Sequence, residues 1–144
     1  SLDLENKPNK ALWSNDMLVP FDEESNKRTY TFTNCWNNSV YYHGNVPNNE
    51  FKLYKKVTII LGKSVSSKES FQFTLGKSDY MKISNINLKK GDKIVYDGVQ
   101  TWRNGTPINH RCSNAQPKFY PGWNDFAFNQ QVKSVTFDMK FYYK

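Results

Sequence analysis

The chain has 144 residues, a formal net charge of +7 and an aromatic content of 16%. This length predicts one domain, and a domain of that size buries roughly two thirds of its chain surface on folding. The aromatic content excludes a disordered or low-complexity chain, which would lack these large apolar side chains. The sequence also contains no signal peptide and no apolar run long enough for a membrane helix, so we expect no membrane insertion.

The positive charges are spread along the chain, and the densest local cluster is only Lys52, Lys55 and Lys56. Nucleic-acid-binding proteins usually concentrate their basic residues in a patch beside base-stacking groups, and no such motif is present. Net charge by itself informs on solubility and association. We therefore expect no nucleic-acid partner. A nucleic-acid-binding β-barrel is the weakest alternative, because only the charge favours it.

Residues 1–27 give little indication of secondary structure. The short segment around Trp13 fits either a helical turn or an irregular edge element. Residues 28–33 then alternate between apolar and polar, which predicts a strand with Tyr30 and Phe32 on one face. Asn37 and Asn38 are expected to end that strand.

The middle of the chain continues with short strands separated by turns. Residues 57–61 form a continuous apolar run rich in β-branched side chains, which predicts a strand buried on both faces. Residues 69–75 alternate, and we expect Phe71, Phe73 and Leu75 to point inward. Asn104-Gly105 is the strongest hairpin signal, because both residues tolerate the positive φ angles of a type I′ turn.

The closing stretch, residues 119–144, opens with the turn signal Pro121-Gly122-Trp123-Asn124 and ends in a long alternating run. Four members of one face of this run are predicted core residues: Val135, Phe137, Met139 and Phe141. Because no amphipathic helix is apparent and turn signals recur between short strands, the sequence predicts a single all-β domain over residues 1–144. Its expected form is an antiparallel β-sandwich or barrel.

The turn signals follow an order that resembles the C-terminal domain of the distal tail protein family of long-tailed, non-contractile bacteriophages. Members of this family tend to carry a Gly-Asn/Asp-Val-Pro segment, a Gly-Asp turn, an Asn-Gly or Asp-Gly hairpin and a Pro-Gly-x-Asn turn. These correspond here to residues 44–47, 91–92, 104–105 and 121–124. The resemblance covers about residues 40–144 and leaves residues 1–39 unexplained.

The resemblance implies a galectin-like or jelly-roll β-sandwich that serves as a structural, non-enzymatic module of a phage tail tip. It implies a location in the virion after assembly in the cytoplasm of the bacterial host. The expected partners are other tail and baseplate proteins, and host cell-wall carbohydrate is a further expected contact. The chain then reads as a C-terminal fragment of a longer protein. The parent is expected to be hexameric and this fragment monomeric.

The titratable residues predict neither a catalytic site nor a metal centre. Cys35, Cys112, His43 and His110 could converge as a zinc set, but their spacing in the sequence does not support one. The carboxylates are dispersed among turns and form no calcium-loop pattern, and no glycine-rich segment precedes a helix. We therefore expect no cofactor and no enzymatic activity. The two cysteines are expected to be buried free thiols, although one disulfide would also be possible.

Aromatic stacking on sugar is the remaining candidate chemistry. Three tryptophans lie beside turn residues and polar groups, and a flat ring flanked by Asn, Asp or Arg is typical of sugar contacts. The more usual role of such rings is to cover the ends of the core, since aromatic side chains dominate burial. The candidate sugar or partner contacts are Trp36, Trp102, Arg103, Trp123 and Asn124. They also motivate the alternative function, a carbohydrate-binding module of a secreted or cell-wall enzyme.

Overall fold

The computed structural model describes residues 27–45, 55–76, 79–114 and 118–141, and this part of the chain is an all-β sandwich. Every strand pair in it is antiparallel. A short 3₁₀ helix, Asn109–Arg111, is the only helical element among these residues. The strands are β1 (Lys27–Tyr42), β2 (Lys55–Ile60), β3 (Ser70–Leu75), β4 (Asp79–Ser84), β5 (Lys93–Tyr96), β6 (Thr101–Arg103), β7 (Thr106–Pro107), β8 (Cys112–Asn114) and β9 (Gly122–Lys140).

The fold class predicted from the sequence is confirmed. The segment around Trp13, the last two residues of the 44–47 motif and residues 51–54 lie outside the described residues. None of the described helices is long and apolar enough to cross a membrane.

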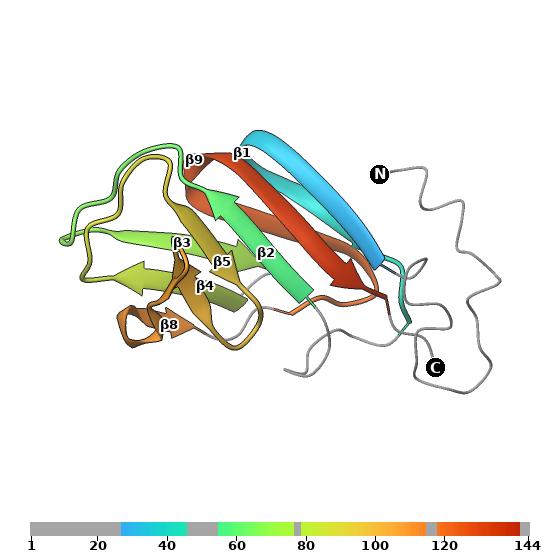
Figure 1. Cartoon of the computed structure of the whole chain (residues 1–144). Helices are drawn as coiled ribbons and strands as arrows, with labels where there is room; N and C mark the ends of the chain where they lie inside the picture. The colour runs from blue at the N-terminus through green and yellow to red at the C-terminus, as the bar shows by residue number, and fades with distance from the viewer. Residues whose placement is uncertain (1–26, 46–54, 77–78, 115–117, 142–144) are drawn as a thin grey trace.

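Two long strands, β1 and β9, run through both layers of the sandwich (Figure 1). The strand order is β7-β6-β5-β2-β9-β3-β4-β8, with β1 paired to β9 outside this path. The C-terminal half of β9 pairs with β2, and its N-terminal half pairs with β3. One sheet therefore folds over on itself, and β1 and β9 bend together where it does so.

The bend lies at a register shift between Cys35 and Asn37 of β1. Cys35 pairs with Val132 of β9, whereas Asn37 pairs with Ala127, so β9 has an excursion of several residues opposite Trp36. Asn34 just before it has a φ of 48°, in the left-handed region that Asn tolerates better than most residues. Such a bulge is a usual way for a strand to change direction.

The expected strand end at Asn37-Asn38 is wrong, because β1 continues without interruption to Tyr42. Pairing with β9 supplies backbone hydrogen bonds to this part of β1, and these outweigh the low β-propensity of asparagine. Both asparagines are exposed, so no polar amide is forced into the core. The irregularity in β1 is instead the bulge between Cys35 and Asn37, directly before these asparagines.

The core lies between the two layers and is rich in phenylalanine. Phe137 is fully buried, and its ring centroid lies 4.8 Å from that of Phe126 and 5.9 Å from that of Phe119. The predicted inward positions are confirmed, since all are buried: Phe71, Phe73, Leu75, Val135, Phe137, Met139 and Phe141. Tyr30 is also buried, and Phe32 packs partly buried against the core.

The prediction that residues 57–61 are buried on both faces is wrong. Val57, Ile59 and Leu61 are buried, whereas Thr58 and Ile60 are only half-buried. The outer face of β2 is partly open to solvent because an antiparallel layer of a sandwich needs to cover only its inner face. The hairpin prediction is confirmed: Asn104 and Gly105 have φ angles of 48° and 88° between β6 and β7.

Candidate functional site

The three candidate tryptophans lie in three different surroundings. Trp36 sits at the bend of β1, Trp102 on β6 and Trp123 near the start of β9. Trp36 and Trp123 are 55% and 54% exposed, whereas Trp102 is half-buried. The cavities lined by Trp36 and by Trp102 share no residue. The structure therefore does not gather these side chains into one site.

Trp123 belongs to a cluster on the outer face of the β1–β9 pair, which we call the Trp123 cluster: Trp123, Tyr41, Ser39 and Asp125. Trp123 faces Tyr41 across the strands, with ring centroids 5.1 Å apart at an angle of 73°. Ser39 faces Asp125 in the next outward row and donates its hydroxyl to the Asp125 carboxylate. An exposed indole beside a carboxylate can stack on a sugar ring and accept a hydrogen bond from a hydroxyl.

Asn124 does not belong to that surface, although it follows Trp123 directly. It is only 6% exposed, and its amide closes the turn that precedes β9. Its Oδ1 accepts from Tyr120 N at 2.9 Å, and its Nδ2 donates to the carbonyls of Tyr120 and Gly122. Gly122 has a φ of 96°, a backbone conformation that residues other than glycine rarely adopt. The amide of Asn124 is thus part of the scaffold.

Arg103 is bound to Asp92 across the β5–β6 region. Its Nε donates to Asp92 Oδ2 at 2.8 Å. The same carboxylate accepts from Lys89 N at 2.8 Å and from Asn104 Nδ2 at 3.1 Å. Burial raises the pKa of Asp92, but these three hydrogen bonds and the Arg103 charge outweigh it and bring the pKa below its usual value. Arg103 therefore stabilises a turn.

Trp102 lies in a straight row of residues that crosses the outer face of one layer. The row alternates with inward-facing core residues along each strand, and its polar end carries a hydrogen bond of 3.2 Å between two threonine hydroxyls. Its members, from β7 to β1, are Pro107, Trp102, Val95, Thr58, Thr136 and Thr31. A cavity of about 590 Å³ beside Trp102 is also lined by Lys56 and Lys93.

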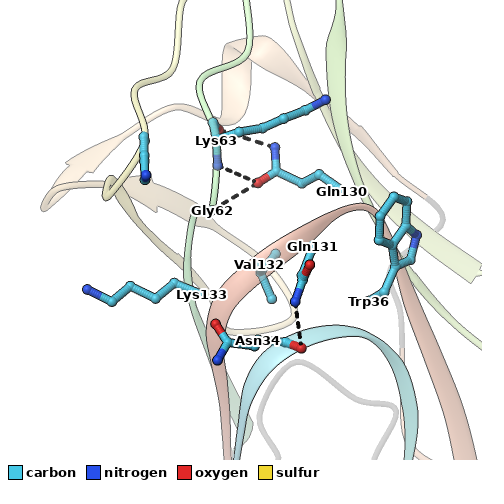
Figure 2. A pocket seen from close by; sticks show the side chains of 9 residues that line it. Asn34, Trp36, Gly62, Lys63, Gln130, Gln131, Val132 and Lys133 are labelled. Atoms are coloured by element: carbon cyan, nitrogen blue, oxygen red, sulfur yellow. Dashed lines mark hydrogen bonds between the residues drawn. The ribbon is translucent and has the colours of Figure 1, made fainter.

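A further cavity, the corner pocket, lies at the bend of β1 and β9 and has a volume of about 540 Å³ (Figure 2). Its lining combines one exposed indole, polar amides and three lysines that come from separate parts of the chain. The lining residues are Asn34, Trp36, Gly62, Lys63, Lys90, Gln130, Gln131, Val132 and Lys133. Sequence reasoning identified only Trp36 among them.

The titratable side chains of the described residues form no metal-binding group, and their two thiols are shielded by burial. Among the residues that the structure describes, no three His, Cys, Asp or Glu side chains are close enough to hold a metal ion. Cys35 and Cys112 are both free thiols as expected, but only Cys35 is buried and Cys112 is half-buried. Burial raises the pKa of each thiol. A raised thiol pKa disfavours the thiolate, which is the reactive form. His43 packs its ring against Tyr41, with centroids 4.6 Å apart.

Comparison of the chain with models of protein families and with curated proteins found no match.

Proposed function

We propose that this chain is a structural, non-enzymatic module of a bacteriophage tail tip, similar in role to the C-terminal domain of distal tail proteins. The observation that carries the proposal is the ordered set of turn signals. Those at Gly91-Asp92, Asn104-Gly105 and 121–124 each contain a glycine with a left-handed φ, between 88° and 96°. They are thus turns that this fold requires.

The character of the surfaces also supports a binding role over a catalytic one. Among the described tryptophans, Trp36 and Trp123 are the most exposed, and both lie on strands of the sheet. Large exposed aromatic side chains are enriched where proteins contact partners or sugars. A tail-tip module needs such contacts with neighbouring baseplate proteins and with the host surface, and it needs no reactive group.

The proposal is tested on virions of a phage whose genome encodes this chain. Mass spectrometry of purified particles is expected to detect its peptides, and immunogold labelling with antibodies against the chain is expected to mark the distal end of the tail. Antibodies pre-adsorbed with the purified chain are the control. Absence of the peptides from virions, or gold confined to the head, would overturn the proposal.

A second candidate function is a carbohydrate-binding module of a secreted or cell-wall enzyme, and the Trp123 cluster favours it. Here a neutral polysaccharide would stack on Trp123 and donate a hydroxyl to Asp125. Titration with cell-wall polysaccharide is then expected to change tryptophan fluorescence in the natural chain and not in Trp123→Ala. If Trp102→Ala, a variant of a half-buried indole elsewhere, lost binding and Trp123→Ala kept it, this cluster would not be the site.

A further inference from the structure

We propose that the corner pocket binds an anionic saccharide, that is, a sugar unit that carries a phosphate or carboxylate group. The indole of Trp36 would stack on the sugar ring, and the lysines would hold the anionic group. The inference rests on the pocket's own residues and does not depend on the proposed tail-tip function.

The first support is the charge of the pocket. Lys63 follows β2, Lys90 lies in the turn before β5, and Lys133 lies on β9, so three separate segments each contribute one lysine to the lining. The nine described residues that line the pocket include no carboxylate. None of the three lysines forms an ion pair with a described residue. A hollow lined by one sign of charge concentrates counter-ions, and a bound anion relieves the mutual repulsion of the lysines.

The second support is the position of Trp36. The bulge of β1 directs this residue out of the strand pairing, and the indole remains 55% exposed at the edge of the pocket. Trp36 takes no part in the aromatic contacts that join the described core rings. Figure 2 shows it on one side of the pocket, with Lys63 extending above Gln130 toward that side. A flat apolar ring beside an ammonium group matches a ligand with an apolar sugar face and a negative substituent.

The third support is the rigidity of the pocket wall. Gln130 is only 2% exposed, and its Oε1 accepts from Gly62 N at 3.0 Å and from Lys63 N at 3.1 Å. Its Nε2 donates to Lys63 O at 3.3 Å, so the backbone of the Gly62–Lys63 segment is fixed against β9. Gln131 Nε2 donates to Asn34 O at 3.1 Å on the other side. Such preorganisation reduces the cost of ordering a site on binding.

The size and shape of the pocket favour a saccharide over a nucleic acid. Its volume of about 540 Å³ lies within the usual range of small-ligand sites. A single-stranded nucleic acid would need a basic groove that follows several phosphates and several aromatic platforms for successive bases. The corner pocket provides one platform and one cluster of lysines. The amides of Asn34 and Gln131 can in addition exchange hydrogen bonds with sugar hydroxyls.

The test is calorimetric titration of the complete chain with four probes: glucose 6-phosphate, glucuronic acid, glucose and inorganic phosphate. Glucose 6-phosphate and glucuronic acid are expected to bind, more weakly as salt rises, and to bind at least about tenfold more tightly than glucose. Lys63→Gln with Lys133→Gln, and separately Trp36→Ala, should each weaken binding about tenfold or more. The matched controls Lys56→Gln and Trp123→Ala, which alter other surfaces, should stay within about twofold.

Several outcomes would overturn the inference. If glucose bound as tightly as the two anionic sugars, the lysines would have no role in binding. Equal binding of inorganic phosphate, unchanged in Trp36→Ala, would mean a site for the bare ion only. A tighter complex with oligothymidylate that depends on the same residues would assign the pocket to nucleic acid. Should Trp36→Ala fail to fold by circular dichroism, the double lysine variant, which alters only exposed side chains, decides alone. Absence of binding by all probes would also refute the proposal.

Discussion

Replacement of Asp92 by Asn should destabilise the chain, because this carboxylate joins the turn before β5 to the β6–β7 hairpin. It is 8% exposed and accepts three hydrogen bonds, two at Oδ2 and one at Oδ1. The substitution keeps the size of the side chain but removes the negative charge. It also places an amide NH₂ group opposite at least one of the donors.

The magnitude follows from the individual contacts. The charge-assisted bond to Arg103 is worth about 1.5–3 kcal/mol when buried, and less here because the Arg103 side chain is 25% exposed. A donor facing the new amide NH₂ group costs about 1 kcal/mol more. The expected loss is therefore about 2–3 kcal/mol. With a urea m-value of about 2 kcal/mol/M, the unfolding midpoint should fall by about 1–1.5 M.

The control is Asp125→Asn, which removes an exposed carboxylate that accepts a hydrogen bond from Ser39 and should change stability by less than about 1 kcal/mol. A double-mutant cycle with Arg103→Met should give a coupling energy of about 1–2 kcal/mol. If Asp92→Asn cost less than about 0.5 kcal/mol, or if the two changes were additive, the structural role assigned to Arg103 would be wrong.

The difference in stability between the natural chain and Asp92→Asn should also depend on pH. Because the folded state lowers the pKa of Asp92, its contribution is complete above the unfolded pKa of about 3.9. The contribution is lost as the pH falls through the lower folded pKa. Urea midpoints measured between about pH 7 and pH 2.5 should therefore converge for the two chains at the acidic end. A difference that stayed constant would contradict the assignment.

Four further outcomes concern the stability of core and glycine variants and the reactivity of one thiol. Phe137→Ala should cost about 3–5 kcal/mol, because it empties the centre of the phenylalanine core, and Phe137→Leu should cost clearly less. Gly105→Ala should cost only about 1 kcal/mol, since the added Cβ meets open space and only the φ of 88° is strained. Gly62→Ala should cost more than Gly105→Ala, because its Cβ would overlap the backbone oxygen of Gln131. With a thiol reagent at pH 8, Cys35 should react slowly in the folded chain and rapidly in urea, because it is 5% exposed and burial raises its pKa.

The sequence predicted those parts of the fold that depend on local alternation. Period-2 patterns identified the inward faces of β3 and of the second half of β9. The dipeptide Asn104-Gly105 identified the hairpin between β6 and β7. These features are local, because side-chain direction along a strand and the φ angles of a turn are set by neighbouring residues. The failure at Asn37-Asn38 has the opposite cause: the pairing with β9, which lies about ninety residues away, outweighed propensity.

The candidate surfaces were less predictable than the fold. Arg103 and Asn124 were candidates because they are adjacent to tryptophans in the sequence. In the structure, both side chains instead form hydrogen bonds that stabilise turns. The corner pocket could not be found from any motif, because Lys63 and Gln130 are brought together only by the bend of β9 against the segment after β2. A lysine or glutamine on a solvated face carries no sequence signal that distinguishes it from a pocket residue.

The bend shared by β1 and β9 connects the stability of this protein with the surface we assign to ligand binding. It closes the sandwich by carrying both strands from one layer to the other, and the same register shift leaves Trp36 exposed. A ligand in the corner pocket would contact three segments that are adjacent only in the folded chain. Its binding must therefore stabilise the fold, by about 1.4 kcal/mol at a free concentration ten times its Kd. The bend is thus both a requirement of the fold and the place where a ligand would act on it.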